Sequence, residues 1–283
     1  KSSCFNTETP FCSTRFRIGY PINYDRVTGI TFPLGQPIGY NIGSRGDGMQ
    51  YTAVIGAMDV EVAGLRERLQ DVEEVPTKGM DFPLYTGMFG EVPVLLARCG
   101  IGKVNAALCT QYLIDHFPIA AVINSGVAGA LQPGVKIGDL VVSNAAMYHD
   151  FDVIFFGYPK GVIPGLSTST FAADERLVHL ALQHGTNVLG ESRVHTGLIV
   201  SGDQFVAGSE QKQSILRHFP EALCVEMEGS AIAHTAYQNQ VPFVILRAMS
   251  DQADDTAPAD FDAYLAEVIP ALNQVVMGMV AQL

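Results

Sequence analysis

Short apolar runs alternate with longer amphipathic segments along this 283-residue chain, from about residue 49 to its end. The runs have the length of buried strands, and we predict strands at residues 51–57, 92–98, 119–124, 138–144, 194–201 and 242–248. The segments between them predict helices at residues 59–70, 102–116, 173–185, 209–218, 227–238 and 260–282. Strands that alternate with helices form a mostly parallel sheet with helices on both faces. Because a hairpin is also expected within residues 79–98, the sequence predicts an α/β fold, a single-domain three-layer αβα sandwich around a mixed, mostly parallel sheet.

Residues 1–48 differ from the rest of the chain. They scatter Gly, Pro, Thr and Asn without helical or alternating periodicity, and they lack the charged and apolar regions of a secretory signal. Residues 45–48 (RGDG) could be encoded by a purine-rich tract typical of a ribosome-binding site, directly before Met49. We therefore expect a translated upstream region or a vector remnant at 1–48 and a folded domain at 49–283. A genuine but disordered extension is the alternative.

The composition of the chain restricts its partners and its compartment. The net charge is −12, and proteins that bind nucleic acid need a basic face, so we expect no nucleic-acid partner. The longest apolar stretches are strand-sized, so we expect no membrane span. Cys99, Cys109 and Cys224 lie in or beside apolar runs, and no CxxC pair occurs. We expect these three thiols to be reduced and buried, in a cytoplasmic protein.

Two of the apolar runs end in carboxylates about 190 positions apart. Residues 53–58 lead into Asp59 and Glu61, and residues 243–250 lead into Asp251. Both runs are typical of buried parallel strands, which deliver side chains to the C-terminal edge where open α/β sheets bind ligands. Two carboxylates in one crevice suggest bond cleavage by one acid and one base. On the residues alone, each carboxylate could instead cap a helix or lie in a loop.

Four further motifs lie between these carboxylates, at residues 100–104 (GIGKV), 124–129 (NSGVAG), 201–205 (SGDQF) and 225–228 (VEME). Together with the two carboxylate motifs, they resemble the bacterial 5′-methylthioadenosine/S-adenosylhomocysteine nucleosidases of the nucleoside phosphorylase/hydrolase superfamily. The resemblance runs unbroken from about Met49 to Leu283. It implies a nucleosidase domain that hydrolyses the N-glycosidic bond of these adenosine thioethers, releasing adenine and 5-methylthioribose or S-ribosylhomocysteine. It also implies a place in methionine salvage and S-adenosylmethionine metabolism.

The resemblance also assigns catalytic roles. Glu61 would activate the attacking water, and Asp251 would protonate the adenine at N7. Ser250 would orient the Asp251 carboxylate, and Arg247 would help to position the water. An acid that works near neutral pH needs a raised pKa, so we expect Asp251 to be partly buried. Many family members have Ser at the position of Val127, so here the water would depend more on Glu61, Arg247 and backbone groups.

The substrate-binding residues follow from the same resemblance. Glu228 and Met227 would bind the ribose hydroxyls, with Glu226 nearby, because a carboxylate accepts hydrogen bonds from two vicinal hydroxyls. Phe205 would stack on adenine, and the backbone of Val206 would read the purine edge. The floor of the pocket would be formed by Ala128 and Gly129. An apolar wall around the 5′ group would be formed by Met58, Ile101, Val153, Phe156, Tyr158, Pro164 and Phe261.

Residues 152–164 would form a loop with an unusual share of apolar side chains. Residues 155–158 (FFGY) would be a costly exposed patch on a monomer. In the family, this loop reaches across a two-fold axis. We therefore expect a homodimer in which the 152–164 loop completes the site of the partner; a loop folded back on its own core is the alternative.

No cofactor and no metal is expected. Residues 149–152 (HDFD) and the other histidines lack an HExxH or a paired spacing, and residues 56–58 lack the further glycines of a dinucleotide fingerprint. Phosphorylase relatives need an arginine in the first loop to hold phosphate, whereas residues 56–61 contain two carboxylates and no arginine. Water is therefore the expected nucleophile. The alternatives are a 6-amino-6-deoxyfutalosine hydrolase, a purine nucleoside phosphorylase and a nucleoside-binding protein without catalysis.

Overall fold

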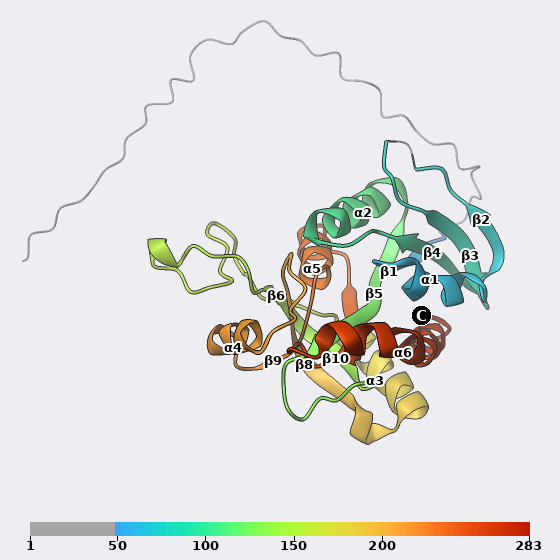
Figure 1. The fold of residues 1–283 in the computed structure, drawn as a ribbon. Coiled ribbons are helices and arrows are strands. Elements are labelled where there is room, and N and C mark those ends of the chain that lie inside the picture. The colour runs from blue at the N-terminus through green and yellow to red at the C-terminus, as the bar shows by residue number, and fades with distance from the viewer. Residues whose placement is uncertain (1–48, 78) are drawn as a thin grey trace, which may run out of the picture. The chain divides into compact units, whose positions relative to one another are not determined.

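A mixed sheet forms the centre of the part of the chain that the computed structural model describes, residues 49–77 and 79–283 (Figure 1). Its strands are β1 (Tyr51–Gly56), β2 (Gln70–Glu74), β3 (Leu84–Phe89), β4 (Val92–Arg98), β5 (Ile119–Ala130), β6 (Leu140–Tyr148), β7 (Phe171–Ala172), β8 (Val194–Ser201), β9 (Ala222–Glu226) and β10 (Phe243–Asp251). The α-helices of this part are α1 (Asp59–Arg66), α2 (Lys103–His116), α3 (Glu175–Leu189), α4 (Ser209–His218), α5 (Gly229–Gln238) and α6 (Ala257–Val280). Short 3₁₀ turns lie at Ile154–Phe156 and Glu191–Arg193. The predicted boundary at residue 48 lies outside the described residues.

The strand order is β10-β6-β8-β9-β5-β1-β4-β3-β2, with β7 beside β6. β1 lies between β4 and β5 and is parallel to both, while β3 and β4 form the predicted antiparallel hairpin. β10 pairs antiparallel with β6 and also parallel with β5, from Phe243 opposite Val122 to Asp251 opposite Gly129. Because β10 pairs with β6 and also with β5, the strands β10, β6, β8, β9 and β5 close into a ring. The ring brings strand ends together that are far apart in the sequence.

Helices cover both faces of the sheet, as predicted. Along β1, Ala53 and Ile55 belong to a core that includes Leu113 of α2, whereas Val54 belongs to a core that includes Leu65 of α1 and Leu272 of α6. Successive residues of a strand point to opposite faces, so this alternation defines the two faces. Helices α2 and α5 cover one face, and α1, α3 and α6 cover the other. The three-layer arrangement is therefore confirmed.

The strands of the site are longer than the sequence predicts. The predicted strand at 119–124 continues to Ala130, and the predicted strand at 242–248 continues to Asp251. The residues that extend β5 are small and include two glycines, which are typical of turns, yet all of them are buried. Strands β2 and β9 were not predicted at all. Both are only five residues long, which leaves little periodicity to detect.

Helix α6 corrects one expectation from the sequence. Its residues 263–280 form an 18-residue stretch with a mean hydropathy of 1.4, long and apolar enough to cross a membrane. The expectation that apolar stretches are only strand-sized is therefore wrong. The side chains of Val268, Leu272, Val276 and Met279 are buried in the core that α6 shares with β10 and α3. Packing in this core accounts for the apolar composition of the helix.

Candidate active site

An open pocket lies where β1, β5, β9 and β10 end, and it has an empty volume of about 530 Å³ including its mouth. This is the edge of the sheet that the sequence predicted. The predicted site residues that line it are Met58, Glu61, Ile101, Ala128, Gly129, Phe205, Glu226, Met227, Glu228, Ser250, Asp251 and Phe261. A concave, mostly apolar lining with a few polar groups suits a small molecule such as a nucleoside.

Glu61 lies in the first turn of α1, directly after β1, and its side chain is buried. Its Oε2 accepts hydrogen bonds from the N–H groups of Ala57 (2.7 Å) and Met58 (2.9 Å), and its Oε1 accepts one from the N–H of Val127 (3.0 Å). Burial raises the pKa of Glu61, while the Arg247 guanidinium and the three N–H groups oppose this rise. Glu61 thus both caps α1 and lines the pocket. A fixed carboxylate with a raised pKa suits a general base.

Asp251 is the last residue of β10 and is also buried. Its Oδ1 accepts a hydrogen bond from the N–H of Ala253 (2.8 Å), and its Oδ2 accepts one from the hydroxyl of Ser250 (2.9 Å). Burial raises the pKa of Asp251, and the bonds from Ala253 and Ser250 oppose the rise. A buried carboxyl that keeps its proton to higher pH can act as a general acid. The Ser250 contact is the geometry that the predicted orienting role requires.

Both carboxylates lie against β5, and two of its glycines leave room for them. A Cβ on Gly126 would lie 2.5 Å from Oε1 of Glu61 and 3.0 Å from Nη1 of Arg247. A Cβ on Gly129 would lie 2.6 Å from Oδ1 of Asp251. The two glycines are three positions apart, which is at most about 10 Å along a strand. Base and acid therefore lie beside one short backbone segment, and a side chain at either glycine position would displace the neighbouring carboxylate.

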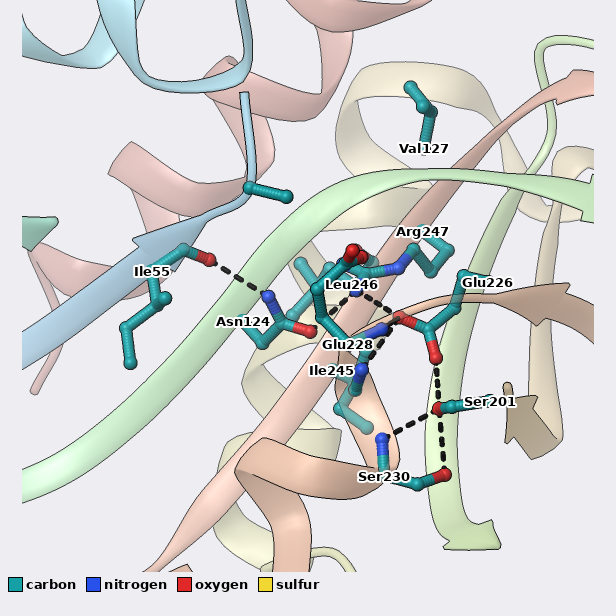
Figure 2. Close-up of polar contacts among 12 residues, drawn as sticks. Ile55, Asn124, Val127, Ser201, Glu226, Glu228, Ser230, Ile245, Leu246 and Arg247 are labelled. Atoms are coloured by element: carbon teal, nitrogen blue, oxygen red, sulfur yellow. Dashed lines mark hydrogen bonds and ion pairs between the residues drawn. The ribbon is translucent and has the colours of Figure 1, made fainter. Parts of the chain in front are cut away.

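Arg247 does not line the pocket; it is buried within the ring of strands. Its Nη2 donates to Glu226 Oε2 (2.5 Å) and to Asn124 Oδ1 (2.6 Å), and Asn124 donates to the Ile55 carbonyl (Figure 2). The positive charge of Arg247 still lowers the pKa of Glu61. The geometry thus gives Arg247 an electrostatic influence on the predicted base, and its part in positioning a water stays a prediction.

Glu226 is the other half of this buried ion pair. Its second oxygen accepts a hydrogen bond from Ser201, which also bonds to Ser230 (Figure 2). Its Oε2 also accepts bonds from the N–H groups of Glu228 (3.0 Å) and Gly229 (2.7 Å). Burial alone would raise the pKa of Glu226, but the Arg247 charge and these bonds lower it. Both carboxylate oxygens of Glu226 therefore accept hydrogen bonds from groups of the protein itself.

Glu228 has the opposite electrostatic balance. Its Oε1 accepts a hydrogen bond from the N–H of Gly102 (2.8 Å). Burial and then the negative charge of Glu226 raise the pKa of Glu228 to about 8. Glu228 and Met227 line the same pocket as Glu61 and Asp251. A carboxyl group that is not tied to a cation can exchange hydrogen bonds with ligand hydroxyls, as predicted for the ribose.

Aromatic rings lie at the mouth of the pocket. Phe205 is 46% exposed, and its ring packs edge-to-face against Phe261 with a centroid distance of 5.7 Å. Ile101, at 54% exposure, lies on the same pocket. An exposed aromatic ring beside an open pocket is available for stacking on a planar base. The predicted stacking of adenine on Phe205 is compatible with this placement.

Six predicted site residues lie outside the pocket lining: Val153, Phe156, Tyr158, Pro164, Val206 and Arg247. The first four belong to the loop after β6, which extends away from the sheet (Figure 1). Phe156 is 73% exposed and Tyr158 is 43% exposed. The alternative of a loop folded back on its own core is wrong for these two rings. Val206 is buried and faces a neighbouring polar cavity.

Some residues of the site were not predicted from the sequence. Ala57 and Val225 line the pocket but were not predicted to do so, and each directly precedes a predicted site residue. The buried polar residues Asn124 and Ser201 lie within two of the motifs, and Ser230 lies two positions after a third, but none of them was given a role. A polar residue inside an apolar strand was the available signal, because buried polar groups require partners. The prediction of buried free thiols is confirmed for Cys99, Cys109 and Cys224.

Comparisons with known proteins point to one family. Residues 51–281 match the family model of the phosphorylase superfamily. The chain is 41% identical over 232 residues to a 5′-methylthioadenosine/S-adenosylhomocysteine nucleosidase of Staphylococcus carnosus, covering 81% of this chain and 99% of the relative. A relative with the same name from an Exiguobacterium is 42% identical over 230 residues, covering 81% of this chain and 97% of the relative.

Solved structures give the same result. The structure resembles that of the 5′-methylthioadenosine/S-adenosylhomocysteine nucleosidase from Neisseria meningitidis in complex with methylthio-immucillin-A. The TM-score is 0.79 and the identity is 42%, with 83% of this chain and 100% of the other covered. Both the sequence and the fold are thus shared with one family. The chain belongs to the phosphorylase superfamily and, within it, to the 5′-methylthioadenosine/S-adenosylhomocysteine nucleosidases.

Proposed function

We propose that this protein hydrolyses the N-glycosidic bond of 5′-methylthioadenosine and S-adenosylhomocysteine. The products would be adenine and 5-methylthioribose or S-ribosylhomocysteine. The observation that carries the proposal is that Glu61 and Asp251 line one pocket beside the same stretch of β5, each with a raised pKa. Relatives of about 40% identity bear the name of this activity.

In the proposed reaction, Asp251 donates its proton to N7 of the adenine. The electron pair of the glycosidic bond leaves with the base, so positive charge develops on the ribose. Glu61 takes a proton from a water molecule, whose oxygen forms the new bond to the anomeric carbon from the opposite face. Ser250 keeps the Asp251 carboxyl in its orientation through their hydrogen bond. Solvent then restores both carboxyl groups to their starting states.

The charge of the pocket favours water over phosphate as the nucleophile. Among the described residues that line it, Glu61, Glu226, Glu228 and Asp251 are acidic, and none is lysine or arginine. A phosphate dianion would find no cation in this lining and would lie against the ionised Glu61 carboxylate. We therefore favour a hydrolase over a purine nucleoside phosphorylase.

We further propose a cytoplasmic homodimer in which the 152–164 loop closes the 5′ pocket of the partner. Phe155 is 93% exposed and Phe156 is 73% exposed, and Val104 and Leu108 lie exposed one turn apart on α2. Exposed apolar side chains in this number are typical of an interface. The loop would add the apolar wall that a thioalkyl group needs. Such an enzyme would serve methionine salvage and S-adenosylmethionine metabolism.

The test is adenine release from 5′-methylthioadenosine, S-adenosylhomocysteine, adenosine and 6-amino-6-deoxyfutalosine, with and without inorganic phosphate. We expect release that does not depend on phosphate, free 5-methylthioribose as the sugar product, and incorporation of oxygen from labelled water. A ribose 1-phosphate product would show a phosphorylase instead. Faster turnover of the futalosine derivative than of either thioether would support that alternative function.

A further inference from the structure

The adenine-stacking loop, defined here as residues 202–206, has little regular structure to hold it. It belongs to neither strand β8 nor helix α4. The active-site pocket lies on its Phe205 side, and a second, polar cavity is lined by Gln204 and Val206. With open space on two sides, the position of the loop depends on contacts that its own residues make elsewhere.

Lys103 provides those contacts together with two aspartates. The Lys103 ammonium lies 2.5 Å from Asp150 Oδ2 and 3.7 Å from Asp203 Oδ2. The backbone N–H of Lys103 donates to Asp203 Oδ1 (2.8 Å), and the N–H of Asp203 donates to Asp150 Oδ2 (3.0 Å). These four interactions tie the start of α2, the end of the β6 segment and the adenine-stacking loop to one another.

The partial burial of this cluster favours a persistent ion pair between Lys103 and Asp150. The side chains of Lys103 and Asp150 are only 23% and 20% exposed, so water screens their ion pair less than a surface pair. Burial alone would raise the pKa of Asp150, but the bond from Lys103 and the N–H of Asp203 lower it. Without the ammonium, the Asp150 and Asp203 carboxylates would lose the cation that lies near both of them.

The cluster also connects the adenine-stacking loop with two other parts of the pocket lining, Ile101 and Glu228. Lys103 follows Ile101 and Gly102, and the N–H of Gly102 donates to Glu228. Asp203 precedes Phe205 by two positions. The contacts of residues 102 and 103 therefore fix Phe205, the predicted adenine platform, relative to the predicted ribose carboxylate Glu228 and to Ile101 of the predicted 5′ wall. Glu61 and Asp251 are held separately, by α1 and β10.

We propose that Lys103 is a positioning residue, which with Asp150 and Asp203 sets the adenine-stacking loop for substrate binding. This inference rests on the proposed function, since it takes Phe205 as the adenine platform. Because the cluster holds binding groups rather than the two catalytic carboxyls, its loss affects the binding of adenine and nucleoside more than the chemical step.

The test compares Lys103→Met, Lys103→Arg and Arg176→Met in the full chain. Methionine removes the charge but keeps an apolar stem beside Tyr148, whose ring lies 5.4 Å from Lys103 Nζ. Arg176 is a cation of α3 that contacts the Leu283 carbonyl, and α3 begins beside Phe243 at the other end of β10 from Asp251. It is therefore the matched control for loss of a cation far from the pocket.

We measure kcat and KM for 5′-methylthioadenosine, the dissociation constant of adenine without turnover, and the melting temperature. Lys103→Met should raise KM and the adenine dissociation constant about tenfold, as expected for the loss of charge-assisted hydrogen bonds. The value of kcat should change by less than about threefold. Lys103→Arg should restore most of the affinity, and Arg176→Met should resemble the wild type.

Unchanged adenine affinity in folded Lys103→Met would overturn the proposal, as would a loss of kcat with KM unaltered. Should Lys103→Met fail to fold, Asp203→Asn takes its place, because an amide oxygen can still accept from the Lys103 N–H. That variant must weaken adenine binding, and wild-type affinity in it would count against the proposal. A wild-type enzyme that binds adenine but hydrolyses no nucleoside would instead refute the proposed function.

Discussion

The pocket has two halves that are built differently. In the half that holds the predicted acid and base, Glu61 is 4% exposed and Asp251 is 2% exposed, and both are fixed by backbone N–H groups. In the half that would hold the rest of the substrate, Ile101 is 54% exposed and Phe205 is 46% exposed. The first half is complete within one chain. The second is open, and its apolar side chains have little cover.

The difference has a physical reason. A buried carboxyl group is costly unless it has partners, so the catalytic half must be built into strands that fix those partners. Apolar and aromatic side chains gain free energy only when something covers them, which a substrate or a second subunit can do. Changes in the strand-built half should therefore reduce the rate of the chemical step. Changes in the loop-built half should reduce affinity and selectivity.

The largest effects should come from the strand-built half. Asp251→Asn should lower kcat by about 10²–10⁴ while nucleoside binding is retained, because the amide cannot protonate the leaving base. Glu61→Gln should lose at least as much, because the attacking water keeps its protons until late in the reaction. Steady-state kinetics and a direct binding measurement on each variant check this.

Asp59→Asn is the matched control for Glu61→Gln. Asp59 lies in the same first turn of α1 but is exposed, and it pairs with Arg98 at 3.0 Å. It should keep near-wild-type turnover if burial in the pocket, rather than negative charge at the helix start, makes the base. Normal turnover by Glu61→Gln or by Asp251→Asn would refute the assigned role and remove the contrast between the halves.

An intermediate effect is expected in the loop-built half. Replacing Phe156 and Tyr158 with Ser should weaken dimerisation and raise KM for 5′-methylthioadenosine by about tenfold or more, the scale of a lost apolar contact in a pocket. Adenosine, which lacks the thioalkyl group, should suffer less. Analytical ultracentrifugation and kinetics on both substrates measure this, with Val72→Ser on the exposed strand β2 as the control. A fully active wild-type monomer would contradict it.

The smallest effect should be the pH dependence of stability caused by Glu228. Its folded-state pKa of about 8 lies above the ordinary value of 4.5, so its protonated form stabilises the fold. This contribution is fully present below about pH 4.5 and is lost as the pH rises through about 8. Glu228→Gln carries no such proton, so its melting temperature should rise relative to the wild type between these limits.

The expected change is a few degrees for each pH unit in this range, because one unit corresponds to about 1.4 kcal/mol and 1 kcal/mol shifts the melting temperature of a domain of this size by about 2–4 °C. Melting curves of both proteins from pH 5 to pH 9 provide the measurement. A constant difference across this range would show that the pocket tolerates the Glu228 charge, and it would contradict the raised pKa of this group.

The sequence by itself determined the order of the helices and of the longer strands, and the strand ends at which Glu61 and Asp251 lie. These features depend on local periodicity, which short-range packing rules translate into elements. It also indicated the family, because the six motifs occur in one order. Twelve of the predicted site residues line the pocket as a result.

Only the tertiary structure decided how those elements meet. The pairing of β5 with β10 makes Gly126 and Gly129 the neighbours of the two carboxyls, and it turns Arg247 toward Glu226 rather than into the pocket. The contact of Lys103 with Asp203 spans a hundred positions. Such contacts depend on strand register and on the closure of the ring, which no local pattern encodes, because each residue's partners are fixed only when distant segments pack together.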